Sequence, residues 1–346
     1  MSEKQKSIIV VFGQIVVSIN MQTRITYFDK LKGLTIIFVV IGHVLTHSLK
    51  IHSLTIELLV VSWYMPLFFF ISGYFYLHSL SRITSFTDLL KTIGKRMLQL
   101  LVPFFVVGWV ESVVRNHSIM SVPDLRFGWF LPTLFYCILF YSVLFYVFKT
   151  LNITNWLVRL IVFGVIFGGL AALYKFVNPS IPYYLHFLKS IPFFSFGILY
   201  SRHEKLQNFM FHDVVFAIAL VCFVGCLAVQ KYMGVNFSFS AFFAIVCLVK
   251  LFKTYDENIP VLLSKIGKVT LPIYVFHGLF LPYFPHWASV LLPSDCSETF
   301  LSNPDFLLPF LVAVLISVPV IFLSMLLHRV IDSNKYLKML FYGQLR

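Results

Sequence analysis

The sequence predicts an all-α, polytopic membrane protein with about ten transmembrane helices. Of its 346 residues, 59% are hydrophobic and only 12% are charged, whereas soluble domains carry roughly 25% charged residues. The apolar residues, among them 40 phenylalanines, come in long blocks instead of alternating patterns. A helix needs about 20 predominantly apolar residues to cross a bilayer, so these blocks place most of the chain within a membrane.

We place ten spans along the chain, several of them close to the ~20 residues that crossing requires. The span at 187–201 is short and requires tilt or local thinning of the bilayer. Two charged segments, residues 87–97 and 253–268, are expected to form cytoplasmic connections. The predicted spans are approximately 33–50, 56–79, 98–115, 127–148, 158–177, 187–201, 213–230, 236–252, 269–292 and 306–328.

The basic residues test this arrangement, because Lys and Arg collect on cytoplasmic loops. With a cytoplasmic amino terminus, 21 basic residues lie inside and 6 outside, which together make up the 27 in the chain. This bias predicts that both termini are cytoplasmic. It also accounts for the net charge of +13, and since no interleaved aromatic patch accompanies the basic residues, no nucleic-acid partner is expected.

The chain is predicted to form a single membrane domain over residues 21–346, since no internal repeat, low-complexity tract or Pro/Gly-rich linker divides it. Residues 1–20 are expected to be a non-native or disordered extension, with Met21 as the native start. Lys4 and Lys6 precede a short apolar run, as in a signal peptide, but no small-x-small cleavage pattern follows.

The first predicted span combines polar residues at its start with a deeply placed histidine. Residues 27–43 have the sequence YFDKLKGLTIIFVVIGH, in which Asp29 and Lys32 are three residues apart and can pair on one helix face. At ~1.5 Å per residue, His43 lies roughly 16 Å from Lys32 on the same face, near mid-bilayer. This pattern suits a basic anchor for an anionic ligand with a deeper general base. It suits equally a snorkelling lysine and a histidine satisfied by a neighbouring helix.

Other candidate positions each have an ordinary structural explanation. Ser72 and Gly73 in the second span allow a hydroxyl contact, but they are also typical of small-residue helix packing. Arg96 opens the third span and can hold a phosphate bidentately, although arginine is also common at the cytoplasmic interface. Glu111 and Arg115 can pair near the outer end of that span.

The cysteines give no sign of a metal site. All five lie mostly in apolar runs, without CxxC or Cys/His ligand spacing, and are typical of small buried hydrophobic residues. No metal cofactor is therefore expected.

Taken in order, six segments of the chain resemble the acyltransferase-3 family of bacterial membrane O-acyltransferases. A basic residue, ten intervening residues and a histidine form the central motif of that family, and they match Lys32 and His43. The FFxSG element matches residues 69–73, and a Ser-x-Pro stretch followed by Phe-Gly matches residues 190–197. The segments are YFDKLKG…IGH, WYMPLFFFISGYFY, KRMLQLLVPFF, WFLPTLF, SIPFFSFG and IGKVTLPIYVFHG.

The resemblance implies an enzyme that transfers an acyl group from acyl-CoA, most directly acetyl-CoA, to a hydroxyl of a carbohydrate. In this interpretation His43 deprotonates the acceptor, because imidazole with a pKa near 6.5 is a suitable general base. Asp29 orients Lys32, and Ser72 lines or polarises the site.

Basic residues at the cytoplasmic end are expected to hold the phosphates of the donor, which is made on that side. We assign this role to Lys32, Arg96 and Lys95. The chain departs from the family here: paired arginines three residues apart are common in the family, whereas Arg96 is followed by Gln99. The neighbouring lysines would have to supply the missing charge.

The expected acceptor is a cell-surface polysaccharide or its lipid-linked precursor, and the expected location is the inner (cytoplasmic) membrane, surrounded by lipid. The alternative is a transporter or flippase for an anionic solute or lipid-linked sugar, with the same buried polar residues serving as a relay. The lack of an internal repeat disfavours a transporter. A non-catalytic assembly protein would leave the shared Lys32 and His43 face unexplained.

Overall fold

The computed structural model describes residues 25–51, 61–116, 128–177, 181–233, 239–284 and 307–344, and within these ranges the secondary structure is helical, with no strand. The all-α prediction is confirmed for this part of the chain. The predicted extension at residues 1–20 lies outside the described residues.

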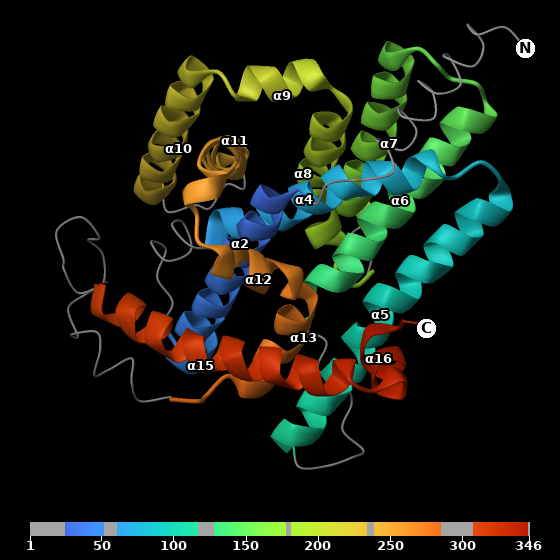
Figure 1. Cartoon of the computed structure of the whole chain (residues 1–346). Coiled ribbons are helices and arrows are strands. Elements are labelled where there is room, and N and C mark those ends of the chain that lie inside the picture. Colours follow the sequence, from blue (N-terminus) through green and yellow to red (C-terminus); the bar gives the residue numbers. More distant parts are fainter. Residues whose placement is uncertain are drawn as a thin grey trace, which may run out of the picture.

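Long helices cross one another around a central group formed by α2, α4 and α8, and shorter helices fill the connections (Figure 1). A five-residue π-helical turn, η1 (Val44–Ser48), continues α2, and a 3-10 turn, η3 (Asp256–Asn258), follows α11. The helices are α2 (Thr26–His43), α4 (Ser62–Ser81), α5 (Phe86–Asn116), α6 (Phe130–Thr150), α7 (Trp156–Val177), α8 (Tyr184–Arg202), α9 (Glu204–Met210), α10 (Asp213–Met233), α11 (Ser240–Thr254), α12 (Val261–Lys268), α13 (Thr270–Phe280), α15 (Leu307–Asp332) and α16 (Lys335–Tyr342).

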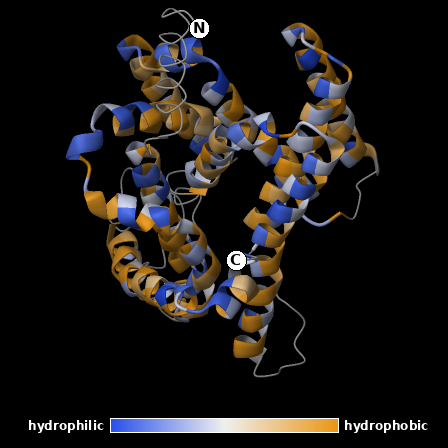
Figure 2. Ribbon diagram, turned by 45° about the vertical axis from the view of Figure 1, so that its right-hand side comes forward, coloured by the Kyte–Doolittle hydropathy of each residue, from blue (hydrophilic) through white to orange (hydrophobic). Residues whose placement is uncertain are grey.

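Five helices in the described part of the chain are long and apolar enough to cross a membrane: α5, α6, α7, α10 and α15. Each coincides with a predicted span. In the most apolar window of α7 no residue is buried inside the protein, so this helix presents an apolar surface that suits lipid contact. Figure 2 shows the same character across the molecule, with long hydrophobic stretches along most helices.

The span predicted at 269–292 is interrupted. Helix α13 has 11 residues and ends at Phe280, so at ~1.5 Å per residue it covers only about 16 Å of the ~30 Å hydrocarbon core. Leu281 is extended, with φ −66° and ψ 116°, because a residue that precedes proline is pushed away from helical geometry. Pro282 therefore ends the helix well before the predicted boundary.

The two segments predicted as cytoplasmic connections are also largely helical. Residues 87–97 belong to α5, which begins at Phe86. The hydroxyl of Ser85 accepts a hydrogen bond from the Asp88 amide, and the Asp88 carboxylate accepts one from the Ser85 amide, so a reciprocal cap starts this helix. Within residues 253–268 the chain forms α12, which packs against α2.

Close backbone contact joins α4 to α8. A side chain at Gly73 would collide with the carbonyl of Phe194, and one at Gly197 would collide with the carbonyl of Phe70. Small residues allow this approach, as is common between helices in membranes. Two motifs of the sequence, FFxSG and SFG, thus form one helix crossing.

A second glycine contact joins α2 to α12. A side chain at Gly33 would collide with the carbonyl of Leu263, and one at Gly267 with the carbonyl of Asp29. The contact lies in the first turns of α2 and covers them, so that Asp29 is only 3% exposed. The glycines of the KLKG and IGK segments thereby bury the polar start of the first span.

Candidate active site

Two histidines meet at the deep end of α2. Nδ1 of His43, the last residue of α2, lies 2.6 Å from Nε2 of His277 on α13, and the two rings are stacked with centroids 4.8 Å apart. His277 is buried and His43 is partly exposed. The partner of His43 is thus a residue that the sequence singled out only as part of the IYVFHG segment.

The hydrogen bonds of His277 indicate which nitrogen of each ring carries the proton. Nδ1 of His277 lies 2.7 Å from the carbonyl oxygen of Tyr274 and 3.1 Å from that of Ile273. Carbonyls only accept, so Nδ1 of His277 is the protonated nitrogen. Because charge is costly in a membrane interior, we take both rings as neutral. Nε2 of His277 then accepts from Nδ1–H of His43, and the lone pair of His43 lies on Nε2.

A π-helical turn begins directly after His43. In η1 the amide of Leu49 donates to the carbonyl of Val44 at 2.9 Å, a five-residue step. Such turns are rare and occur frequently at functional sites. His47 lies in this turn, and its ring is edge-on to the ring of His43 with centroids 5.4 Å apart.

At the other end of α2, Asp29 and Lys32 form the ion pair that the sequence predicts. Their Oδ1 and Nζ atoms are 2.8 Å apart, with Asp29 4% and Lys32 23% exposed as side chains. Lys32 also lies over the ring of Phe75 on α4, with Nζ 5.2 Å from the ring centroid. The predicted anchor is therefore a partly exposed cation whose carboxylate partner is buried.

Lys30, in the first turns of α2, forms an ion pair with the connection that precedes α12. Its Nζ lies 2.8 Å from Oδ1 of Asp256, and the hydroxyl of Thr26 donates to the same carboxylate. Burial raises the pKa of Asp256, but the hydrogen bonds from Lys30 and Thr26 outweigh burial and hold this pKa below its ordinary value. The carboxylate is thus charged at neutral pH and holds the start of α2.

Arg96 on α5 approaches the turn of α4 that Lys32 also contacts. Its guanidinium donates to Oε1 of Gln99 at 3.2 Å and to the hydroxyl of Ser79 at 3.3 Å, and it lies 5.9 Å from the ring centroid of Tyr76. Gln99, at the position where the family often has a second arginine, thus holds the first one. Lys95 is exposed on the same helix.

Ser72 lies away from the histidine pair. The α2 turn at Gly42 faces Tyr64 on α4, and Ser72 is eight residues further along α4, or roughly 12 Å at ~1.5 Å per residue. Phe28, near the start of α2, packs against Tyr74 with the two rings tilted and their centroids 4.5 Å apart. Ser72 is therefore level with the Asp29–Lys32 pair and not with His43.

Two cavities lie near the end of α2 opposite to Lys32. One, of about 290 Å³, is lined by His47, Lys50, Glu111 and Gly278, among others. The other, of only about 30 Å³, is lined by His277 together with Glu111. Glu111 is 5% exposed, and a side chain at Gly278 would collide with its carboxylate. Glu111 therefore lines both cavities, with its carboxyl group against Gly278.

Five apolar helices long enough to cross a membrane define the class of this chain, a helical membrane protein. The chain belongs to the acyltransferase-3 family, because the family model, described as an acyltransferase domain, matches residues 25–329. It is therefore a membrane-associated acyltransferase, and the resemblance seen in the sequence is confirmed. Neither the curated proteins nor the solved structures gave a match. Among the described residues no three His, Cys, Asp or Glu side chains are grouped so as to hold a metal ion.

Proposed function

We propose that this protein transfers an acyl group, in the simplest case acetyl, from acyl-CoA to a hydroxyl of a carbohydrate, a cell-surface polysaccharide or its precursor, in the inner membrane. The observation that carries the proposal is the hydrogen bond between His43 and His277. It gives His43 a defined tautomer with the lone pair on Nε2, which is what a general base requires.

In the proposed reaction Nε2 of His43 takes the proton of the acceptor hydroxyl. The hydroxyl oxygen forms a bond to the thioester carbonyl carbon, and the tetrahedral intermediate collapses with cleavage of the C–S bond. The departing thiolate of CoA receives the proton from His43, so the histidine returns to its neutral form. His277 does not touch the substrates in this scheme; it is a positioning residue that holds the imidazole of His43 in orientation.

The donor would enter from the cytoplasmic end of α2. Lys32 and Arg96 contact consecutive residues of α4, Phe75 and Tyr76, which point to different faces of that helix. Each cation would supply a separate contact to the phosphates of CoA. Lys95 adds charge beside Arg96. Ser72, at the level of the Asp29–Lys32 pair, would line the path of the pantetheine arm toward His43.

The acceptor would reach the pair from the opposite side, through the cavity of about 290 Å³ beside His47 and Lys50. The lining of this cavity includes a carboxylate, a cation and an imidazole, which supply both acceptors and donors for sugar hydroxyls. Two substrates that approach from opposite ends of α2 could then react at His43 without either crossing the protein.

Membranes that contain the protein, incubated with acetyl-labelled acetyl-CoA, test this function. Label should move to extractable glycan, and His43→Ala should lower the rate by about 10²- to 10⁴-fold, the usual contribution of a general base. The matched control is His212→Ala, because His212 is exposed in the turn before α10. Full transfer by a folded His43→Ala protein would exclude His43 as the base, and uptake of label without transfer would favour a carrier.

A further inference from the structure

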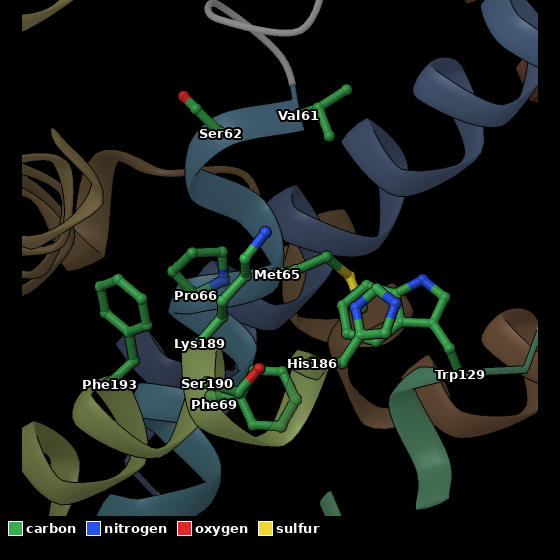
Figure 3. A pocket seen from close by; sticks show the side chains of 10 residues that line it. All are labelled: Val61, Ser62, Met65, Pro66, Phe69, Trp129, His186, Lys189, Ser190 and Phe193. Carbon is green, nitrogen blue, oxygen red and sulfur yellow. The ribbon is translucent and has the colours of Figure 1, made fainter. Parts of the chain in front are cut away.

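A cavity of about 240 Å³ lies between α4, α6 and α8, apart from the histidine pair. Figure 3 shows the side chains around it, which come from α4, from α8 and from Trp129 just before α6. Phe69 and Phe193 are both almost fully buried and form an apolar wall, and Met65 adds to it. The volume is below the roughly 300–1,000 Å³ of pockets for drug-sized ligands, so one small ring fits better than an oligosaccharide.

Aromatic rings give one side of this cavity a fixed shape. Trp129, just before α6, stacks on His186 of α8 with ring centroids 4.4 Å apart and an interplanar angle of 26°. The ring of Phe69 lies nearly parallel to Trp129, at 6.5 Å between centroids. Sugar rings present apolar C–H faces that pack on aromatic surfaces of this kind, while their polar edges seek hydrogen bonds.

The polar groups around the cavity are suited to an anion. Lys189 is exposed at the opening, and no carboxylate belongs to the described lining. Trp129 and His186 lie at the amino-terminal ends of α6 and α8, where helix dipoles and amide groups favour negative charge. Two helix starts and a lysine thus border one cavity.

A serine on the cavity wall adds a hydrogen-bonding group. Ser190 is 6% exposed, lines the cavity and directs its hydroxyl into it (Figure 3). A hydroxyl both donates and accepts hydrogen bonds, so this group can contact a carboxylate or phosphate oxygen of a ligand in the cavity.

We infer that this cavity is a binding site for an anionic sugar residue of the acceptor, with the carboxylate of a uronic acid or the phosphate of a glycosyl phosphate held by Lys189 and Ser190. The inference rests on the proposed function, because the ligand is taken to be part of the acceptor. Ring contacts connect the cavity to the histidine pair: Phe69 to Phe130 at 5.0 Å, Phe130 to Tyr274 at 5.3 Å and Tyr274 to His277 at 5.9 Å between centroids. The site would anchor the acceptor with two rings, Phe130 and Tyr274, between the cavity wall and His277.

Ligand-observed NMR with the purified full chain in detergent micelles tests the inference without acyl-CoA. The probes are glucuronic acid, glucose 1-phosphate, methyl glucoside and inorganic phosphate. We expect one of the two anionic sugars to bind at least tenfold more tightly than methyl glucoside and than inorganic phosphate, and the stronger of the two identifies the anion. Lys189→Gln should weaken it about tenfold, as expected for loss of one charge-assisted hydrogen bond, and Ser190→Ala should also weaken it.

The matched control is Lys175→Gln, since Lys175 is an exposed lysine near the end of α7 and outside the cavity lining. Equal binding of methyl glucoside would overturn the role of charge, and equal binding of inorganic phosphate would overturn the role of the sugar. No binding of either anionic sugar, or binding unchanged in Lys189→Gln, would overturn the site. The acetyl-transfer assay with His43→Ala is a separate measurement, so either idea can fail alone.

Discussion

Replacing His277 by leucine removes the group that accepts the hydrogen bond of His43, while the volume of the buried side chain stays similar. In the structure Nε2 of His277 lies 2.6 Å from Nδ1 of His43, and the loss leaves a buried N–H without its acceptor. His277→Gln is the matched variant, because a glutamine oxygen can take the place of Nε2 and accept the same hydrogen bond.

An unsatisfied buried donor costs about 1–3 kcal/mol. If this cost is borne by the orientation of His43, and each ~1.4 kcal/mol of barrier is a factor of ten in rate, kcat should fall roughly five- to 150-fold in His277→Leu. His277→Gln should recover most of the loss. The KM for acetyl-CoA should change little, because the donor phosphates are proposed to bind at the other end of α2.

Single-turnover transfer from labelled acetyl-CoA at saturating donor measures the chemical step, and size-exclusion chromatography checks that the variants fold. Nitrogen-15 NMR of histidine-labelled protein, assigned with the His43→Ala variant, reports the tautomer directly. We expect Nδ1 of His43 to carry the proton in the wild type and the two tautomers to be mixed in His277→Leu. Wild-type kcat in His277→Leu, or a wild-type His43 protonated at Nε2, would refute the mechanism.

Three further predictions concern the proposed donor contact, the α4–α8 crossing and the carboxylate of Asp256. Lys32→Gln should raise the KM for acetyl-CoA by about five- to tenfold through loss of one charged phosphate contact, as steady-state kinetics would show. Gly197→Val should destabilise the protein by about 1–3 kcal/mol through overpacking at the α4–α8 crossing, measured by denaturation in detergent, whereas Gly164→Val on α7 has open space. Asp256→Asn should cost roughly 1–2 kcal/mol at neutral pH. Because the pKa of Asp256 is lowered in the folded protein, its contribution to the free energy of unfolding is fully present above the pKa of the unfolded state. This contribution is lost as the pH falls through the pKa of the folded state.

Each of these predictions has an outcome that would contradict it. For the donor contact the control is Lys205→Gln, an exposed lysine on α9; an equal rise in KM in both variants would point to general electrostatics. For the glycine contact, equal stability losses at both positions would show that valine is disfavoured for reasons of helix propensity alone. For Asp256, the pH dependence of the free energy of unfolding should differ between the wild type and the Asn variant between about pH 2 and 5. The same dependence in both proteins would show that the carboxylate does not stabilise the fold.

The polar start of the first span could be predicted because it depends on local spacing. Asp29 and Lys32 are three residues apart, so the helix itself brings them together, and the ion pair has the predicted form. Arg96 and Gln99 are also three residues apart, so the same spacing allows the contact between them. The contact of Arg96 with Ser79 was not predictable, because it depends on how α5 lies beside α4.

The lengths of the helices were harder to predict than their positions along the chain. Hydrophobicity located α5, α6, α7, α10 and α15, since lipid-facing helices carry a continuous apolar signal. It failed at the end of α13, where Pro282 stops the helix within an apolar stretch. It also missed the helices of the polar connections, whose stability comes from caps and glycine contacts.

By itself the sequence determined that this is a helical membrane protein and that Lys32 and His43 share one helix face, because hydrophobicity and helical period are local properties. Only the tertiary structure decided what His43 contacts. His277 lies 234 residues away along the chain, and no periodicity relates two positions so far apart. The packing of α13 against α2 brings the two rings together, and two backbone carbonyls of α13 then determine which nitrogen of His43 keeps its lone pair.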